Sequence, residues 1–213
     1  ESQYASSYGY LNAMKDEILN SGEVKYKDEF VWELHIIHDD ETLNAFATPG
    51  GYIYVYTGLI HYLDDASSLA GVMGHEIGHA DRRHSSKQMQ KNYGLQTLLQ
   101  VALGNDPGAL ATIAANLLTL KFSRSDETDA DNASVDYLCN TDFETDGAAN
   151  FFIKIEQSGG SGTPQFLSTH PDPGNRVENI QEKAGEVSCG AESADPLFYN
   201  DMTYQDFQNS LPQ

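Results

Sequence analysis

Cysteine is scarce in this 213-residue sequence, which contains only Cys139 and Cys189. The two lie 50 positions apart and neither belongs to a Cys-x-x-Cys pair, which excludes a zinc ribbon. They could form one disulfide bond, as is typical of extracytoplasmic proteins, or remain two small unpaired side chains. We favour the disulfide bond, because no base that could activate either thiol lies near it in the sequence.

Basic residues are also few: 12 Lys and Arg stand against 32 Asp and Glu, so the formal net charge is −20. Nucleic-acid binding and polybasic membrane anchoring both depend on clustered Lys and Arg, and this composition argues against either function. Long apolar runs are missing as well. No stretch approaches 18 uninterrupted apolar residues, so the sequence predicts no transmembrane segment.

The first residue is Glu1 rather than Met, and no basic-then-apolar leader follows it. We interpret the chain as a mature or trimmed product from which a signal peptide or lipid anchor has been removed. On this interpretation we expect an extracytoplasmic location, in the periplasm or associated with a membrane.

The length suits one domain over residues 1–213, and the apolar pattern predicts a helix-rich α+β fold with a small sheet. Apolar residues at helical spacing predict helices over residues 4–19, 57–63, 66–84, 125–138, 146–157 and 175–184. Alternating residues predict strands over residues 30–37, 44–47 and 52–56. Thr48-Pro49-Gly50-Gly51 separates the last two strands and favours a β-hairpin.

Three segments lie between or beyond these elements. Residues 86–120 contain two apolar-periodic stretches split by Gly104-Asn105-Asp106-Pro107-Gly108, which indicates an inserted helical hairpin. Residues 158–175 begin with a Gly- and Ser-rich stretch, which we interpret as a loop that can cover a functional site. Residues 191–213 are acidic and loop-like, but their aromatic side chains predict that this tail packs on the rest of the chain.

The pentapeptide His75-Glu76-Ile77-Gly78-His79 lies in the predicted helix of residues 66–84. At 100° per residue, His75 and His79 are separated by about 40° around the axis and about 6 Å along it. Their imidazoles can therefore bind one cation, with Glu76 close enough to act on a water beside it. The alternative, two buried core histidines, would need a hydrogen-bond partner for each ring.

The third ligand should come from another element. His84 is about 180° from His75 on a continuous helix, so we expect it on the surface or supporting a ligand unless the helix breaks. Glu127 and Asp131 are four residues apart and share one helix face, so one can bind the ion while the other holds a ligating imidazole. The spacing alone does not choose between them. We expect the remaining histidines outside the site, in structural or exposed positions: His35, His38 and His61.

The chain resembles the M48 family of zinc metallopeptidases. The resemblance rests on motifs that run in the family's order: Asn44-Ala45-Phe46-Ala47, Pro49-Gly50-Gly51, Gly58-Leu59-Ile60, His75-Glu76-Ile77-Gly78-His79, Ser123-Arg124, Glu127, Ala130-Asp131, Thr169-His170-Pro171 and Arg176. One departure is Ser134, where the family usually has glycine. The resemblance implies a zincin-like fold, in which a small sheet packs on the helix that binds the metal.

The resemblance also implies a role for each matching residue. It implies one Zn²⁺ per chain bound by His75, His79 and Glu127, with Glu76 as general base. Asp131 would support a ligand and His170 would donate to the transition state. We expect Arg176 to brace an acidic partner rather than to touch substrate.

These roles predict a zinc metalloendopeptidase that hydrolyses unfolded or extended protein segments through a zinc-bound water activated by Glu76. Residues Asn44, Ala45, Phe46 and Ala47 would bind the substrate as an edge strand. One alternative is a non-proteolytic, metal-stabilised binding or chaperone-like protein. Another is a latent protease whose cleft is covered by the hairpin of residues 86–120, the loop of residues 158–163 or the acidic tail. The sequence leaves the natural substrate and the oligomeric state open.

Overall fold

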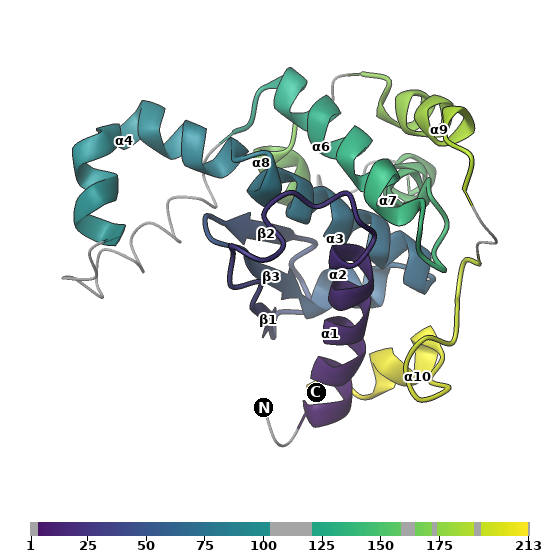
Figure 1. Cartoon of the computed structure of the whole chain (residues 1–213). Coiled ribbons are helices and arrows are strands. Elements are labelled where there is room, and N and C mark those ends of the chain that lie inside the picture. Colours follow the sequence, from purple (N-terminus) through teal and green to yellow (C-terminus); the bar gives the residue numbers. More distant parts are fainter. Residues whose placement is uncertain (1–3, 103–120, 159–164, 172–173, 190–192, 213) are drawn as a thin grey trace.

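The computed structural model describes residues 4–102, 121–158, 165–171, 174–189 and 193–212. Within these ranges the helices are α1 (Ala5–Leu19), α2 (Thr57–Tyr62), α3 (Ala66–Asp81), α4 (His84–Ala102), α6 (Arg124–Leu138), α7 (Gly147–Gln157), α8 (Gln165–Thr169), α9 (Arg176–Glu186) and α10 (Tyr204–Asn209). The strands are β1 (Leu34–Ile37), β2 (Ala45–Thr48) and β3 (Tyr52–Tyr56). This arrangement confirms the predicted helix-rich α+β fold (Figure 1). None of these described helices is long and apolar enough to cross a bilayer.

The three strands form one mixed sheet in the order β1-β3-β2. β2 and β3 are antiparallel, with Ala45 opposite Val55, so the predicted hairpin is confirmed. The turn between them contains Gly50 and Gly51 with φ of 94° and 87°, a conformation that residues with a Cβ rarely adopt. β1 runs parallel to β3 on the other side.

The first strand is shorter than the predicted range 30–37, because β1 begins only at Leu34. Trp32 has a φ of 49°, which is incompatible with an extended strand. Its carbonyl oxygen accepts a hydrogen bond from Lys15 Nζ at 2.9 Å, and its indole Nε1 donates one to the carbonyl oxygen of Tyr26 at 3.1 Å. These tertiary contacts outweigh the alternating pattern of this segment.

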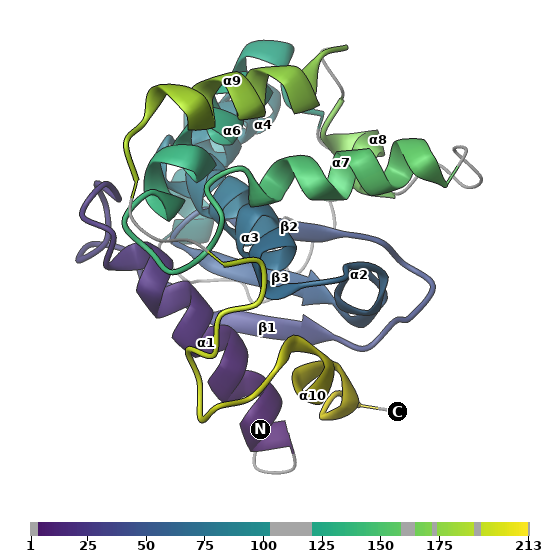
Figure 2. The same cartoon turned by 90° about the vertical axis from the view of Figure 1, so that its right-hand side faces the viewer.

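α3 is the central element, since it packs on β2 on one side and on α6 and α7 on the other (Figure 2). All of its residues are buried, and its small residues allow close approach. A methyl group at Gly71 would collide with the main chain of Ala148 in α7. Ser134 of α6 is fully buried against α3 and donates a hydrogen bond to the carbonyl oxygen of Gly71 at 2.8 Å. The serine therefore fits at the position where the resembling family usually has glycine.

The helix predicted over residues 66–84 is confirmed as α3, but it ends three residues earlier than predicted. α3 ends at Asp81, whose carboxylate accepts a hydrogen bond from the Tyr137 hydroxyl of α6 at 2.7 Å. Arg83 then has a φ of 62°, a left-handed conformation that a right-handed helix cannot pass through. α4 starts at the next residue, His84.

The inserted helical hairpin predicted over residues 86–120 is described only in its first part. This part belongs to α4, which contains a kink at Gly94 with a φ of 76° and extends away from the sheet (Figure 1). Residues 103–120 lie outside the described ranges. The predicted loop over residues 158–175 is also only partly described, and it contains the short helix α8.

The tail is not loop-like throughout, because it forms α10. Thr203 caps this helix: its hydroxyl accepts from the Asp206 amide, and the Asp206 carboxylate accepts from the Thr203 amide. Phe207 stacks on Tyr10 of α1 with ring centroids 4.3 Å apart, and Tyr204 is buried beside them. The prediction that the tail packs on the rest of the chain is confirmed.

Cys139 and Cys189 form a disulfide bond, which confirms the pairing favoured from the sequence. Cys139 directly follows α6, and Cys189 lies shortly after α9. The bond therefore joins the two ends of a 50-residue segment that contains α7, α8 and α9.

We expect the Cys139→Ser/Cys189→Ser double variant to lose about 4 kcal/mol of unfolding free energy, because chain entropy in the unfolded state increases when a 50-residue loop is opened. Urea denaturation followed by circular dichroism measures this difference. A reductant should lower the midpoint of the wild type and leave that of the double variant unchanged. An equal response of both proteins to the reductant would contradict the prediction.

Candidate metal centre

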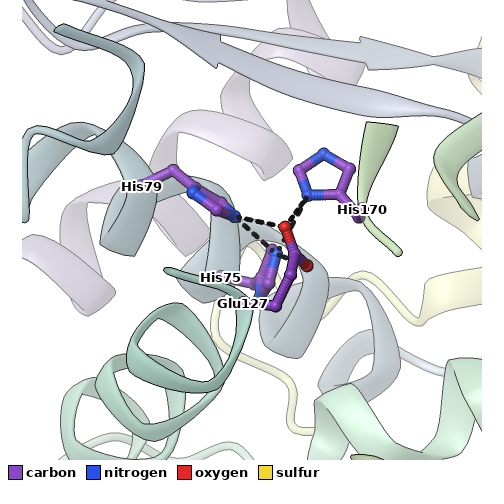
Figure 3. Close-up of side chains that lie close together, drawn as sticks. All are labelled: His75, His79, Glu127 and His170. Carbon is purple, nitrogen blue, oxygen red and sulfur yellow. Dashed lines mark hydrogen bonds and ion pairs between the residues drawn. The ribbon is translucent and has the colours of Figure 1, made fainter. Parts of the chain in front are cut away.

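Four buried side chains from three parts of the fold converge on one point. His75 and His79 come from α3, Glu127 comes from α6, and His170 directly follows α8 (Figure 3). One nitrogen or oxygen atom of each lies within 4.8 Å of the others. Helix spacing predicted the two histidines of α3 as metal ligands, and the resemblance to family M48 implied Glu127 as the third ligand and His170 as a catalytic donor.

The Nε2 atoms of the two histidines of α3 and the Glu127 carboxylate face one another, as the ligands of one metal ion would. His75 Nε2 and His79 Nε2 are 2.9 Å apart. The Glu127 carboxylate faces both rings, with Oε2 3.5 Å from His75 Nε2 and Oε1 3.5 Å from His79 Nε2. Two imidazoles and one carboxylate are the donor set typical of catalytic zinc sites.

Helix geometry explains how the sequence builds this cluster. Four residues separate His75 from His79 on α3, and four separate Glu127 from Asp131 on α6, so each pair occupies one face of its helix. α6 packs along α3 and brings the two faces together. Ser123 caps α6 and fixes where its first turn begins.

The structure places the two candidate carboxylates differently. Glu127 faces the Nε2 atoms of both histidines, whereas Asp131 Oδ1 lies 2.8 Å from His75 Nδ1 on the opposite edge of the ring. Arg176, the first residue of α9, donates to Asp131 from Nε at 2.8 Å and from Nη2 at 2.7 Å. Its Nη1 is 3.1 Å from Glu127 Oε2. Arg176 therefore contacts both carboxylates, as expected for a brace.

The charges in the cluster are suited to a cation. Burial alone would lower the pKa of His75, but hydrogen bonds with Asp131 and Glu127 raise it to about 9. Burial alone would raise the pKa of Glu127, yet the neighbouring His170 and His75 lower it well below its usual range. Burial and the nearby His75 also lower the pKa of His79, which keeps that ring neutral. Without an ion, a proton on His75 thus balances the carboxylates, and a divalent cation could replace it.

Glu76 lies beside the cluster, at a small pocket. Its Oε2 accepts a hydrogen bond from the Ala47 amide at 3.0 Å, and its Oε1 is 3.4 Å from His170 Nε2. Burial is the main cause that raises the pKa of Glu76. The pocket is lined by Asn44, Phe46, Ala47, Glu76, Phe122, Thr169 and His170. Of the predicted substrate strand, only Ala45 is missing from this lining.

The outward edge of β2 is covered in this structure. The Leu43 carbonyl oxygen accepts from the Phe166 amide at 3.2 Å, and the Ala47 carbonyl oxygen accepts from the Ser85 hydroxyl at 3.2 Å. Ala45 between them is only 1% exposed. An extended peptide that paired with this edge would meet these two contacts.

Two aromatic residues that reach the site were not predicted to do so, whereas His84 takes the supporting position that was one of its two expected places. Phe122 stacks on His79 and Phe166 stacks on His170, with ring centroids 4.0 and 4.2 Å apart. His84 Nδ1 lies 3.1 Å from His79 Nδ1. This contact depends on the helix break at Arg83. The residues around the break include no glycine or proline that would have predicted it.

The other histidines are outside the site, as predicted. His35, His38 and His61 are each partly exposed and lie near carboxylates at 3.3 to 3.9 Å.

Comparisons with known proteins agree with the motifs. The sequence profile of peptidase family M48 matches residues 6–184. The "Mitochondrial metalloendopeptidase OMA1" of Arabidopsis thaliana is 32% identical over 160 residues, which cover 72% of this chain and 33% of that protein. The "Beta-barrel assembly-enhancing protease" of Escherichia coli K12 is 30% identical over 167 residues, which cover 71% of this chain and 34% of that protein.

A third relative, "Metalloprotease YcaL" of Escherichia coli K12, is 27% identical over 172 residues, which cover 78% of this chain and 64% of that protein. The chain thus spans about a third to two thirds of the length of these relatives. The family match covers most of the chain and includes every residue of the cluster, so the chain belongs to peptidase family M48.

Proposed function

We propose that this chain is a zinc-dependent endopeptidase that cuts extended or unfolded segments of other proteins. The observation that supports it best is the convergence of His75, His79 and Glu127, with the Glu76 carboxylate and a pocket directly beside them. The names of the relatives, a metalloendopeptidase and two proteases, agree with peptide-bond hydrolysis. What those names say of mitochondria or β-barrel assembly belongs to those proteins.

In this proposal His75, His79 and Glu127 hold one zinc ion. The ion would supply a Lewis acid that polarises the substrate carbonyl and acidifies a water molecule. Glu76 accepts the proton of the attacking water and returns it to the leaving amine. Its position beside the proposed ion and at the pocket suits a group that accepts a proton from water and donates it to the leaving amine.

His170 would stabilise the negative oxygen of the tetrahedral intermediate by donating a hydrogen bond. Its position at the pocket wall, 3.4 Å from Glu76, supports this role. Asp131 orients His75 by accepting from Nδ1, which leaves Nε2 to bind the ion, and Arg176 holds Asp131 in place.

A second candidate is a latent form of the same peptidase. Two observations favour it: His170 Nδ1 is 3.2 Å from Glu127 Oε1, where it could fill the fourth position of the ion, and the Phe166 amide of α8 donates to the Leu43 carbonyl oxygen just before β2. A closed set of four protein ligands is typical of inactive or structural zinc sites. In this form, substrate would pair with β2 by strand addition only after the segment around His170 has moved.

We also propose an oxidising, extracytoplasmic location. The disulfide bond between Cys139 and Cys189 supports it, because such bonds rarely persist in a reducing cytosol.

The test is cleavage of unfolded casein and of a peptide library. We expect elemental analysis to find one zinc per chain, chelation to stop cleavage, and added Zn²⁺ to restore it. The library should show cleavage next to many different residues, since main-chain pairing with a strand selects little for side chains. A metal-loaded protein that binds casein without cutting it would favour the chaperone-like alternative.

The His170→Ala variant separates the two candidate forms. If His170 donates to the transition state, its removal should lower kcat about 10²- to 10³-fold. Faster cleavage by the variant would instead favour the latent form.

A further inference from the structure

His84 is a buried titratable residue that lies against the metal cluster. The proposed function gives it no role. It is 3% exposed, at the first position of α4. Its Nδ1 lies 3.1 Å from His79 Nδ1, and its Nε2 lies 3.1 Å from Asp129 Oδ2. His84 thus connects a proposed metal ligand to a carboxylate of α6 that is half exposed to solvent.

The contact requires the unusual backbone between α3 and α4. On a continuous helix His84 would lie about 140° around the axis from His79, because five residues separate them. The left-handed Arg83, with a φ of 62°, turns the chain so that the imidazole of His84 returns to the ring of His79. The chain keeps this conformation although non-glycine residues adopt it rarely.

The hydrogen-bond partners of His84 determine which nitrogen carries the proton in His84 and in His79. An ionised carboxylate can only accept, so His84 Nε2 donates to Asp129 Oδ2. In a neutral imidazole the other nitrogen accepts, and His84 Nδ1 therefore accepts from His79 Nδ1. With its proton on Nδ1, His79 presents an unprotonated Nε2 to His75 and Glu127.

The opposite tautomer of His79 would not bind a cation there. Its proton would lie on Nε2 and would point at the position between His75 Nε2 and Glu127 Oε1. His75 avoids this tautomer through its direct hydrogen bond with Asp131. Among the described contacts, no carboxylate accepts a hydrogen bond from His79 Nδ1. His84 Nδ1 is the acceptor there instead.

We propose that His84, oriented by Asp129, is a positioning residue that holds His79 in the tautomer and ring orientation that bind the metal. This inference rests on the proposed zinc site, but it assigns a role to residues that do not touch the ion. It predicts an effect on metal binding that is independent of cleavage.

The test compares two replacements of the same side chain. His84→Phe keeps a flat ring but cannot accept a hydrogen bond from His79 Nδ1. His84→Asn places an amide oxygen near the position of Nδ1, where it can accept. We expect His84→Phe to weaken Zn²⁺ affinity about 10- to 100-fold, measured by competition with a chromogenic chelator, and His84→Asn to regain most of that loss.

Two further measurements separate positioning from a general loss of structure. The visible absorption bands of the Co²⁺-loaded protein report ligand geometry, and they should change in His84→Phe and return towards the wild type in His84→Asn. Asp129→Ala should weaken Zn²⁺ binding by a smaller factor. The matched controls are His61→Phe, a partly exposed histidine, and Asp136→Ala on α6, which should both bind like the wild type.

The outcomes distinguish a failure of the proposed role of His84 from a failure of the proposed zinc site. If the wild type binds Zn²⁺ and His84→Phe binds it equally tightly, or if His84→Asn is as weak as His84→Phe, the role of His84 is wrong while the zinc site stands. If the wild type does not bind Zn²⁺, both proposals are wrong. If His84→Phe does not fold, as judged by circular dichroism, wild-type affinity in Asp129→Ala overturns the role of His84.

Discussion

Glu76→Gln is expected to keep bound zinc and to lower kcat for casein cleavage by about 10²- to 10⁴-fold, the usual contribution of a general base. Glutamine has nearly the same shape and can still accept the hydrogen bond from the Ala47 amide, but it cannot accept a proton from water. The measurements are zinc content by elemental analysis and initial rates of cleavage.

The matched control is Glu33→Gln, the same substitution at an exposed carboxylate near His35, which should cleave at the wild-type rate. Wild-type activity in Glu76→Gln with zinc bound would remove Glu76 as the proton acceptor. Loss of zinc together with activity would show instead that the substitution disturbs the site, and the mechanism proposed for Glu76 would lose its support.

Arg176→Met is expected to lower the unfolding free energy of the metal-free protein by about 3–5 kcal/mol, because it leaves buried carboxylates without their cationic partner. Arg176 is 2% exposed and contacts both Asp131 and Glu127. Urea denaturation measures the effect. Arg176→Lys should recover part of it, since lysine keeps the charge but cannot form the two parallel hydrogen bonds to Asp131.

The effect of Arg176→Met should depend on pH. Burial alone would raise the pKa of Asp131, but the charge of Arg176 lowers it. A depressed folded-state pKa contributes stability that is fully present above the unfolded value of about 4 and is lost as the pH falls through the folded value. The stability difference between wild type and variant should therefore be largest near pH 7 and shrink below about pH 4.

The matched control is Arg124→Met, at an exposed arginine that begins α6. It should change the unfolding free energy by less than about 0.5 kcal/mol, as is usual for surface positions. A similarly small effect of Arg176→Met would contradict the bracing role.

Local patterns predicted most of the secondary structure and failed where distant contacts decide the backbone. The alternation over residues 30–37 predicted a longer strand, but Trp32 is bound by Lys15 and Tyr26. The helix predicted over residues 66–84 ends already at Asp81, because the chain turns at Arg83. Neither departure has a glycine or proline as a local signal.

In the metal cluster, too, local patterns predict one part of the arrangement and distant contacts decide the other. That His75 and His79 face one way follows from the sequence alone, because the pitch of an α-helix places residues four apart on one side. The same rule puts Glu127 and Asp131 on one face, so it cannot tell which carboxylate faces the Nε2 atoms and which faces Nδ1. The packing of α6 on α3 decides that.

Only the tertiary structure determines the contact of His84 with His79 and the contact of α8 with Leu43. His84 reaches His79 through one left-handed residue, and α8 reaches Leu43 from more than 120 positions away in the chain. Sequence periodicity reports only neighbours within a few turns of the same helix or strand. Contacts between elements depend on how their buried faces fit together, and that fit exists only in the folded chain.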